Sequence, residues 1–582
     1  METAKCLQRL VMPNARFGAS ESMYIRGSLF SFSENIITIF PGGKISFDTY
    51  YNGFSTILWK EKCGIHDLAF NASGTGLAKI SAMLITEENS KYELASATVA
   101  LDNLTREIFT LDLGNTLNRG IIYIEIIPID GIVSLNSGEW FTKQSPRREV
   151  KLGISITHFD RKKYVIPSMM RIKREILEDD NYRGLIDFTV IDNSNNITAN
   201  EANGIKVIPN KNTGGAGGFM RGLLHYIDEG DFTHTLFMDD DASCEAECIK
   251  KTYSILSYAL NDNAAVSGSL FAGARPDSLV EKGAFFDRVC HPIYSGWRLN
   301  DVESLVKTET LIQFPNYGAW WFFAFPINHV KSFAFPFFVR GDDILFGMMN
   351  DFDILTTNGI ACYAEEDFSS KTSPLTAYLD TRNHLVNMLY FGRPVKDIIG
   401  TYISFHLKSL LAHQYGSAAA INLAFKHVYG APDFWENNAD MKDVREELNS
   451  ITFNEKMKPI SPPDNSVEFK CNFETKSRRL FRIITLNGFL APLKNKIIYQ
   501  EKISGVSLRQ IFRYKKIFYY DRSTKNGYIA EASKKQQALG FIKILFNTLK
   551  IIITSKAQRK KYSEVTCKLT TEGFWRKILL RQ

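Results

Sequence analysis

Short apolar and alternating runs mark the first part of the chain. They cover residues 28–32, 36–40, 55–59, 93–101 and 120–127, and turn residues such as Pro41-Gly42-Gly43 separate them. Runs of this length between turn signals are typical of antiparallel strands. We therefore expect an N-terminal β-sandwich or jelly roll over residues 1–148.

Near residue 151 the pattern changes to strands that alternate with helices. Apolar runs with strand character cover residues 151–157, 185–193, 204–209 and 235–238, and helical periodicity marks residues 161–180 and 219–227. Such alternation indicates a mostly parallel sheet with both faces covered. The predicted fold class is α/β, with a Rossmann-like sheet over residues 149–392.

The rest of the chain is mostly helical and basic. Helical periodicity covers residues 377–391 and 395–408, and residues 459–465 have the composition of a linker. We expect a helical, basic C-terminal region over residues 393–582. Its apolar residues next to Lys and Arg, at 543–553 and 574–581, either contact an anionic membrane surface or belong to solvated helices that pack on the body.

Composition excludes several classes. Of the 582 residues, 45% are hydrophobic and 23% charged, which is ordinary for globular proteins. A net charge of +7 is too small to indicate nucleic acid binding. Eight scattered cysteines without a CxxC pair argue against a zinc site or a disulfide framework and fit a reducing cytosol.

Targeting signals are not apparent in the sequence. The N-terminus has no apolar h-region, and no uninterrupted apolar run of about 18 residues occurs, so neither a signal peptide nor a transmembrane helix is expected. We expect a cytoplasmic protein, with peripheral contact to the inner face of the plasma membrane through the basic C-terminus as the alternative to a freely dissolved one.

Three carboxylates, Asp239, Asp240 and Asp241, follow the apolar run at 235–238. Crowded carboxylates repel one another unless a cation sits among them. Oxygen ligands suit Mg²⁺ or Mn²⁺, and the carboxyl ends of sheet strands are where open α/β folds bind ligands. This pattern predicts a metal–diphosphate site and nucleotide-sugar chemistry.

Other polar residues also follow predicted strands, among them His158, Asp160, Arg161, Asp192 and Asn193. A glycine-rich segment, residues 212–218, opens a predicted helix. Glycines there let a ligand approach the backbone at a helix N-terminus, or they form a tight structural turn.

Two further pairs are candidates for chemistry. Trp320 and Trp321 either stack on a sugar or form a buried structural pair. Asp342 and Asp343 follow another apolar run, where one of them can act as a general base or as the N-cap of the next helix. A third acidic group occupies residues 365–367.

The order of these motifs over residues 151–390 resembles the GT-A inverting glycosyltransferases of family 2, and most closely the polymerising galactofuranosyltransferases of bacterial cell walls. The motifs are Thr157-His158-Phe159-Asp160-Arg161, the glycine-rich segment, Asp239-Asp240-Asp241, Trp320-Trp321, Gly341-Asp342-Asp343 and Thr381-Arg382-Asn383. The first differs from the family's usual Thr-Phe-Asn-Arg, and Cys362-Tyr363 stands where the family has a metal-binding Trp-His pair.

The resemblance implies a role for each motif. Residues that would bind the nucleotide are Phe159, Arg161, Asp192, Asn212, Asp239 and Asp240. Asp239 and Asp241 would hold Mn²⁺ or Mg²⁺, with Glu365, Glu366 or water as the open choices for the next ligand. Trp320 and Trp321 would shape the sugar and acceptor site, and Asp343 would be the base, with Asp342 beside it.

The function that this implies is inverting, metal-dependent transfer of a sugar, with galactofuranose from UDP-galactofuranose as the expected donor and a growing glycan or lipid-linked glycan as the acceptor. The alternatives are another UDP- or dTDP-sugar as donor, a sugar nucleotidyltransferase, and a non-catalytic carbohydrate-binding protein. The additional regions on either side leave room for a homo-oligomer.

Overall fold

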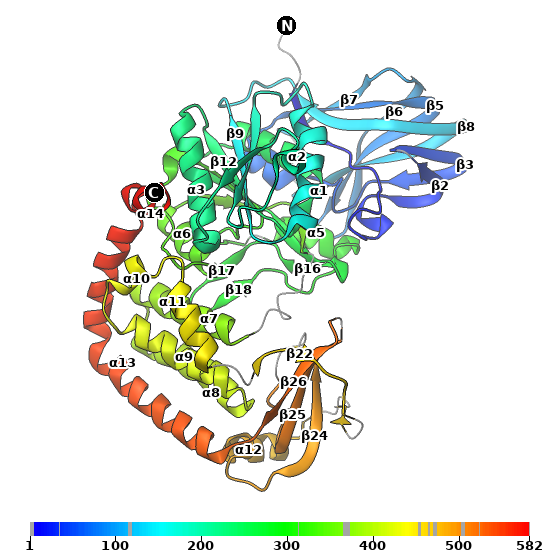
Figure 1. Cartoon of the computed structure of the whole chain (residues 1–582). Helices are drawn as coiled ribbons and strands as arrows, with labels where there is room; N and C mark the ends of the chain where they lie inside the picture. The colour runs from blue at the N-terminus through cyan, green and yellow to red at the C-terminus, as the bar shows by residue number, and fades with distance from the viewer. Residues whose placement is uncertain are drawn as a thin grey trace.

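The computed structural model describes residues 5–33, 35–114, 119–311, 313–364, 373–451, 455–463, 466–468, 474–501, 507–522 and 524–580. An antiparallel β region, a central mixed sheet with helices on both sides, and a C-terminal part with helices and a small sheet follow one another along the chain (Figure 1). The chain therefore changes architecture near the places where its hydrophobic pattern changes.

The N-terminal region is a single hydrogen-bonded sheet of eight strands. They follow the order β2-β3-β8-β5-β6, with β1 and β4 beside β8 and β7 beside β5, and all their pairs are antiparallel. The strands are β1 (Lys5–Arg9), β2 (Arg26–Ser33), β3 (Ile36–Ser46), β4 (Phe54–Ser55), β5 (Asp67–Thr86), β6 (Lys91–Asp102), β7 (Arg106–Asp112) and β8 (Gly120–Thr142).

Two long strands, β5 and β8, join the two ends of this sheet, and their pairing shifts register at several points. Such irregularities bend a sheet so that it can enclose its own core, and Trp59 and Trp140 are fully buried inside it. The antiparallel β region is as predicted, whereas the division into the two packed sheets of a jelly roll is not confirmed. The strand predicted at 55–59 is largely wrong, because Ile57–Lys62 is a helical turn.

The central sheet has seven strands in the order β11-β10-β9-β12-β19-β14-β20. Neighbours are parallel except where β19 takes part, which pairs antiparallel with β12 and β14. The strands are β9 (Leu152–His158), β10 (Ile186–Asp192), β11 (Lys206–Pro209), β12 (His234–Asp239), β14 (Ala264–Ser267), β19 (Phe323–Pro326) and β20 (Asp353–Leu355). The predicted mostly parallel sheet is thus present, with one antiparallel strand that the sequence pattern did not reveal.

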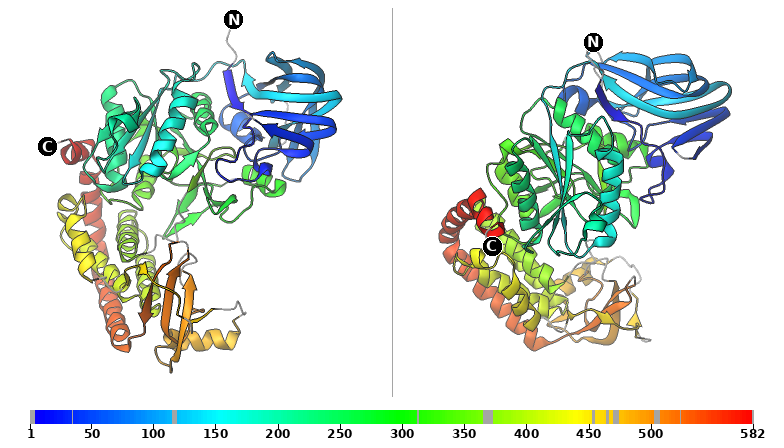
Figure 2. Two further views of the ribbon diagram at one scale, coloured as in Figure 1. Left: turned by 45° about the vertical axis from the view of Figure 1, so that its right-hand side comes forward. Right: turned by 45° about the horizontal axis from the view of Figure 1, so that its top comes forward.

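Helices cover both faces of this sheet. Strands such as β9 and β10 are therefore buried along almost their whole length. Helix α3 packs on the face of β9 that carries Gly153 and Ser155, and α1 lies on the other side of the sheet (Figures 1 and 2). The helices and helical turns of this region are α1 (Lys162–Ile172), η3 (Lys173–Leu177), α2 (Ala199–Ala202), α3 (Gly214–Glu229), α4 (Ala246–Tyr258), α5 (Val302–Thr310), η4 (Ile327–His329) and α6 (Asp342–Asn350).

Short strands extend the central region beside the carboxylate cluster. A four-stranded sheet follows the order β13-β21-β15-β16, and β17 and β18 form a two-stranded sheet. These strands are β13 (Ala242–Cys244), β15 (Ser269–Ala272), β16 (Arg275–Glu281), β17 (Ala284–Phe286), β18 (Cys290–Pro292) and β21 (Ala361–Ala364).

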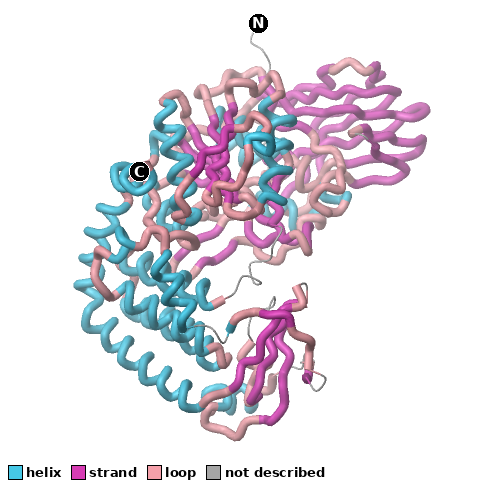
Figure 3. The backbone as a smooth tube through the Cα atoms, viewed as in Figure 1, coloured by secondary structure: helices cyan, strands magenta, loops and turns pink. Residues whose placement is uncertain are grey.

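The C-terminal part is helical, as predicted, but it also contains a five-stranded sheet that the sequence reading missed (Figure 3). The helices and the helical turn are α7 (Pro374–Tyr390), α8 (Val395–Leu411), α9 (Tyr415–Val428), α10 (Phe434–Asn437), α11 (Lys442–Ile451), α12 (Lys476–Ile484), η7 (Leu486–Gly488), α13 (Lys534–Leu569) and α14 (Glu572–Leu579). The strands are β22 (Lys458–Pro459), β23 (Ser466–Val467), β24 (Lys494–Glu501), β25 (Tyr514–Asp521) and β26 (Asn526–Glu531).

Helix α13 runs back along α8, α9 and α7 and brings α14 against α3 (Figure 1). The indole N–H of Trp575 on α14 donates to the Ala334 carbonyl at 2.7 Å. By length and composition alone α13 passes the test for a membrane span, with a mean hydropathy of 1.5 over an 18-residue window of which 17% is buried. Lys543 and Lys550 interrupt its apolar run, and length and composition alone do not identify a transmembrane helix, so the expectation that the chain has none stays a prediction.

Candidate active site

The carboxyl ends of β9, β10 and β12 meet at one edge of the central sheet. Pairing places His158 opposite Asp192 and Thr157 opposite Asp239. Residues that lie far apart in the sequence therefore come together where open α/β sheets bind ligands. The predicted juxtaposition of the first motif, Asp192 and the carboxylate cluster is what the structure shows.

Asp240 makes the most contacts with the first motif at this edge. Its buried carboxylate accepts hydrogen bonds from the Phe159 backbone N–H at 3.0 Å and from the Arg161 guanidinium at 3.2 Å, and it lies 3.2 Å from the His158 ring. Burial by itself lowers the pKa of His158, but hydrogen bonds to Asp240 and Asn196 raise it above its ordinary value. Asp240 thus fixes the first motif in place.

Arg161 joins two of the three carboxylates, because its Nη1 also lies 2.8 Å from Asp241 Oδ2. The guanidinium compensates charge on a crowded acidic site. The Phe159 side chain beside it is 46% exposed, so its ring is open to a ligand.

Asp192 organises the loop after β10. Its carboxylate accepts hydrogen bonds from the backbone N–H groups of Ser194, Asn196 and Ile197 at 2.8 to 2.9 Å. Asn212 has a similar local role, since its side-chain oxygen accepts from the Gly214 N–H at 3.0 Å. The structure brings both residues to the predicted edge, and their contacts there shape the loops.

Packing explains the glycine-rich start of α3. Gly214 has a φ of +73°, and a side chain there would overlap the Phe338 carbonyl, which accepts the Ala216 N–H at 3.0 Å. At Gly218 a Cβ would overlap the Thr157 side chain on β9. Of the two readings of this segment, the structural one accounts for these glycines.

Asp342 and Asp343 open α6 directly after a constrained loop. Phe338, Arg340 and Gly341 have φ values of 74°, 70° and 86°. Residues other than glycine rarely adopt this left-handed region. Backbone strain of this kind persists only where the surrounding structure enforces the conformation.

Helix α7 supplies that enforcement. Arg382, which is buried, donates to the Phe337 carbonyl, and Asn383 donates to the carbonyls of Val339 and Arg340. The Arg340 guanidinium in turn makes a two-pronged contact with Asp380. The Thr381-Arg382-Asn383 motif therefore holds the loop that presents the aspartate pair.

The aspartate pair lies in a strongly unfavourable environment for charge. Burial raises the pKa of Asp342 well above its usual range, and the charges of Asp343 and Asp239 raise it further. Burial also raises the pKa of Asp343, to about 6. Since Asp239 acts on Asp342, the ends of β12 and the start of α6 form one acidic site.

Sequence reasoning missed Glu281 on β16. Burial, and then the charge of Asp343, raise the pKa of Glu281 to about 8. Glu281 stands in a polar stretch without a motif, so only the three-dimensional packing identifies it as part of this environment.

The two tryptophans face different surroundings. Trp320 is 5% exposed and packs against Phe219, Phe237 and Phe346 with ring centroids 5.0 to 5.6 Å apart, which makes it a core residue. Trp321 is half-buried and donates its indole N–H to the Gly268 carbonyl at 3.1 Å. Of the pair, Trp321 remains the candidate for substrate contact.

Asp239 and Asp241 fit a hard divalent cation by their chemistry. Among the described residues no group of three or more His, Cys, Asp or Glu is placed to hold a metal. Mg²⁺ characteristically uses only one or two carboxylates, with phosphate oxygens and water completing its shell, and this pair matches that pattern.

The structure describes only some of the residues considered near the metal-binding position. Tyr363 belongs to the core, since it stacks on Phe17 at 4.7 Å and accepts a hydrogen bond from Tyr51 at 2.9 Å. Glu365 and Glu366 lie outside the described residues, so their role stays a prediction.

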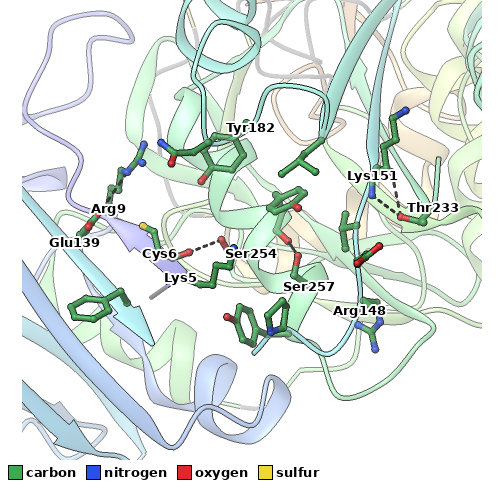
Figure 4. A pocket seen from close by; sticks show the side chains of 18 of the residues that line it. Lys5, Cys6, Arg9, Glu139, Arg148, Lys151, Tyr182, Thr233, Ser254 and Ser257 are labelled. Atoms are coloured by element: carbon green, nitrogen blue, oxygen red, sulfur yellow. Dashed lines mark hydrogen bonds and ion pairs between the residues drawn. The ribbon is translucent and has the colours of Figure 1, made fainter. Parts of the chain in front are cut away.

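A cavity of about 980 Å³ lies at the opposite edge of the central sheet, between this region and the N-terminal sheet (Figure 4). Its lining includes Lys151 and Thr233, which precede β9 and β12, and Arg9 and Glu139 from β1 and β8. Since the carboxylates lie at the other ends of these strands, this cavity is separate from the candidate active site.

Comparison with known proteins shows the class of the chain: it is a glycosyltransferase. Galactofuranosyltransferase GlfT2 of Mycolicibacterium smegmatis is 22% identical over 445 residues, 70% of this chain and 68% of that protein. The GlfT2 of Mycobacterium tuberculosis is 23% identical over 422 residues, 67% of this chain and 66% of that protein. The resemblance drawn from the motifs is confirmed by these relatives, of which the matches span about two thirds.

A scan against models of protein families finds no match. Among solved structures, the mannosyltransferase PcManGT of Pyrobaculum calidifontis aligns with a TM-score of 0.29 and 12% identity over 53% of this chain and 82% of that one. Glucosyl-3-phosphoglycerate synthase of Mycobacterium tuberculosis aligns with a TM-score of 0.28 and 13% identity over 42% of this chain and 81% of that one.

Proposed function

We propose that the protein is an inverting glycosyltransferase that moves galactofuranose from UDP-galactofuranose to a growing glycan or lipid-linked glycan. The observation that carries this proposal is the acidic end of β12, where Asp239 pairs with Thr157 and where Asp240 and Asp241 contact the first motif through Phe159 and Arg161. Both curated relatives are named galactofuranosyltransferases, which supports the choice of donor.

The donor's nucleotide would lie at the edge formed by β9, β10 and β12. The exposed Phe159 ring offers a face for the uracil base, and Arg161 offers positive charge for the diphosphate. Asp239 and Asp241 would hold Mn²⁺ or Mg²⁺, which when bound supplies positive charge that stabilises the departing UDP.

Asp343 would act as the general base. Its carboxylate accepts the proton of the acceptor hydroxyl while that oxygen forms a bond to the anomeric carbon. The bond from the anomeric carbon to the UDP oxygen breaks on the opposite face, and the electron pair leaves with UDP. The anomeric configuration inverts, and no covalent intermediate with the enzyme forms.

The test is a screen for UDP or dTDP release with UDP-galactofuranose, UDP-galactopyranose, UDP-glucose and dTDP-rhamnose, each with an oligogalactofuranoside acceptor and with or without Mn²⁺. We expect turnover with UDP-galactofuranose and extension of the acceptor, with NMR showing inversion. Turnover with another donor instead would show that the enzyme transfers a different sugar. Release of diphosphate would indicate a nucleotidyltransferase, and acceptor binding without turnover a carbohydrate-binding protein.

A further inference from the structure

The cavity of Figure 4 lies where three parts of the chain meet: the N-terminal sheet, helix α4, and the loops that lead into β9, β10 and β12. Its volume of about 980 Å³ is at the upper end of the range of about 300–1,000 Å³ that small-molecule sites cover, and such sites occur preferentially where two regions of a protein meet. The chemistry of its lining therefore indicates which class of ligand fits.

Aromatic side chains make up the apolar part of this lining. Phe141 belongs to β8 and Tyr182 precedes β10, whereas Tyr253 and Tyr258 belong to α4. The rings of Tyr182 and Tyr253 meet edge to face, with their centroids 5.7 Å apart. Aromatic rings pack against the C–H surfaces of sugars, and tyrosine adds a hydroxyl that can bond to a sugar hydroxyl. This part of the lining fits a ligand that is apolar on its faces and polar at its edges.

The hydroxyl group of Tyr182 has no hydrogen-bond partner among the residues that the structure describes, although the residue is only 6% exposed. It lies on the cavity wall near Arg9 and Cys6 (Figure 4), and burial raises its pKa above the ordinary value, so that the group stays protonated. Enclosed hydroxyl groups are ordinarily hydrogen-bonded. A hydroxyl of a ligand in the cavity would supply the missing partner.

Planar polar side chains form the wall that the N-terminal sheet contributes. Asn71 on β5 stands opposite Glu139 on β8 in the strand pairing and donates a hydrogen bond to its carboxylate at 3.3 Å. The guanidinium of Arg9 on β1 lies 3.6 Å from the same carboxylate. Donors and acceptors therefore alternate along this wall, which we call the planar row. Because a sugar hydroxyl both donates and accepts, it can bond at several points of such a row.

The charged groups of the lining nearly cancel. Four Lys or Arg stand against three Asp or Glu. Arg148 donates to carbonyl groups at the C-terminal end of α4 at 2.8 and 2.9 Å, and Lys151 forms an ion pair with Asp231. Because these cations already have partners inside the protein, an enclosed anionic ligand would have to compete for them or remain unpaired, which is costly. A neutral ligand does not meet this cost.

We propose that this cavity is a second glycan site, which binds a neutral oligosaccharide away from the acidic end of β12. The sugars pack on the tyrosine rings, and their hydroxyl groups bond to the Tyr182 hydroxyl and to the planar row. The binding of a glycan does not depend on the proposed function, but the identification of that glycan as a stretch of the acceptor rests on it.

The length of the central sheet separates the two sites. Strand β9 runs from the cavity edge to the acidic edge and has seven residues, which at about 3.3 Å per residue corresponds to about 20 Å. The glycan in the cavity is therefore not the end of the acceptor at which transfer takes place. It is an inner part of a long acceptor chain.

The experiment is hydrogen–deuterium exchange of the full-length protein, without donor or metal, with an oligogalactofuranoside, cellohexaose or mannohexaose as the probe. We expect at least one probe to protect residues 146–151 and 181–185, because a bound ligand restricts the opening of the segments that it contacts. Calorimetry with the same probe gives its affinity. Omitting donor and metal makes both results independent of the transfer reaction.

Two variants test the contacts. Tyr182→Phe keeps the ring and removes the hydroxyl, and Asn71→Ala removes one end of the planar row. Each should weaken binding in the cavity about three- to tenfold, which corresponds to one hydrogen bond. The matched control is Tyr123→Phe on β8, because Tyr123 is also buried with a hydroxyl that lacks a partner among the described residues but does not line the cavity. Its binding should equal that of the wild type.

The proposal is overturned if none of the three glycans protects these two segments, or if Tyr182→Phe and Asn71→Ala both bind as tightly as the wild type. Protection of the segments by UDP and by none of the glycans would assign the cavity to an anionic ligand and would also overturn it. If a glycan binds here while the transfer screen detects no galactofuranosyl transfer, the proposed function fails and the second glycan site stands.

Discussion

Asp343 sits in the first turn of α6, where burial raises its pKa to about 6. A base with a pKa just below neutral is ionised at physiological pH and still accepts a proton effectively. Asp342, with the more strongly raised pKa, is suited to stay protonated beside it. The two neighbours are therefore not equivalent, although the sequence presents them as a pair.

Replacing Asp343 with Asn should abolish turnover while leaving UDP binding intact. The substitution keeps the size of the side chain and removes only its ability to take a proton, so we expect kcat to fall about 100- to 10,000-fold. Steady-state kinetics and calorimetry with UDP measure the two effects. Asp351→Asn, at the far end of the same helix, is the control and should retain activity. If Asp343→Asn retains transfer, the base lies elsewhere.

The pH profile of kcat should report the same group. Because the carboxylate is the active form and its pKa is raised to about 6, activity should be low below that pH, rise through it and then level off. Rates of UDP release from about pH 5 to 8 at saturating donor check this. A flat profile across pH 6, with the protein still folded, would remove Asp343 from the role of base.

At the scale of elements, α3 depends on its glycines because it packs closely on β9. Gly218→Ala should destabilise the protein by about 1–3 kcal/mol, since the new methyl group overlaps the Thr157 side chain. Gly215→Ala is the matched control: its Cβ would come no nearer than 3.5 Å to Val339, and alanine favours the helix. Urea unfolding of both variants gives the comparison. Equal stabilities would show that α3 can move away from the sheet.

Asn383 on α7 holds the loop before α6 through hydrogen bonds, and we refer to these contacts as the clamp. Asn383→Ala leaves the carbonyls of Val339 and Arg340 without their donor, which costs about 1–3 kcal/mol. It should also lower kcat more than it changes KM, because Asp343 is no longer held in place.

The control for the clamp is Asn350→Ala at the other end of α6. Asn350 is equally buried and donates to the carbonyls of Ser332 and Phe346, so its loss should reduce stability by a similar amount without the selective effect on kcat. Identical kinetic changes in the two variants would mean that general destabilisation explains both.

The same elements show what a sequence can reveal about a fold. Continuous apolar runs predicted β9, β10 and β12 because both faces of these strands are buried, and the parallel pairing then placed Asp192 and Asp239 at one edge. The direction of β19 and the five-stranded sheet near the C-terminus depend on contacts between distant segments. The contacts of Glu281 and the burial of Trp320 likewise follow from packing, which periodicity does not encode.

On the scale of the whole molecule, the N-terminal sheet region is fixed to the central region close to the active site. Glu245, at the start of α4 and four residues after Asp241, accepts hydrogen bonds from Asn14 at 2.8 Å, Tyr24 at 3.1 Å and Arg16 at 3.2 Å. Glu245 is 4% exposed. This carboxylate therefore links the segment after β1 to the start of α4, just after the acidic cluster.

Glu245→Ala should loosen this link. It removes the acceptor from three donors, of which the Tyr24 hydroxyl belongs to a buried residue, and we expect a loss of about 1–3 kcal/mol. One thermal transition should also separate into two, as the N-terminal region unfolds more independently. Differential scanning calorimetry and limited proteolysis near residue 148 measure both effects. The control is Glu175→Ala, which removes the other partner of Arg16, 3.3 Å away and more exposed, and should cost less than about 1 kcal/mol. If the two variants unfold alike, the hydrogen bonds to Glu245 do not couple the two regions, and other contacts between them, such as the Tyr51–Tyr363 hydrogen bond, carry the attachment.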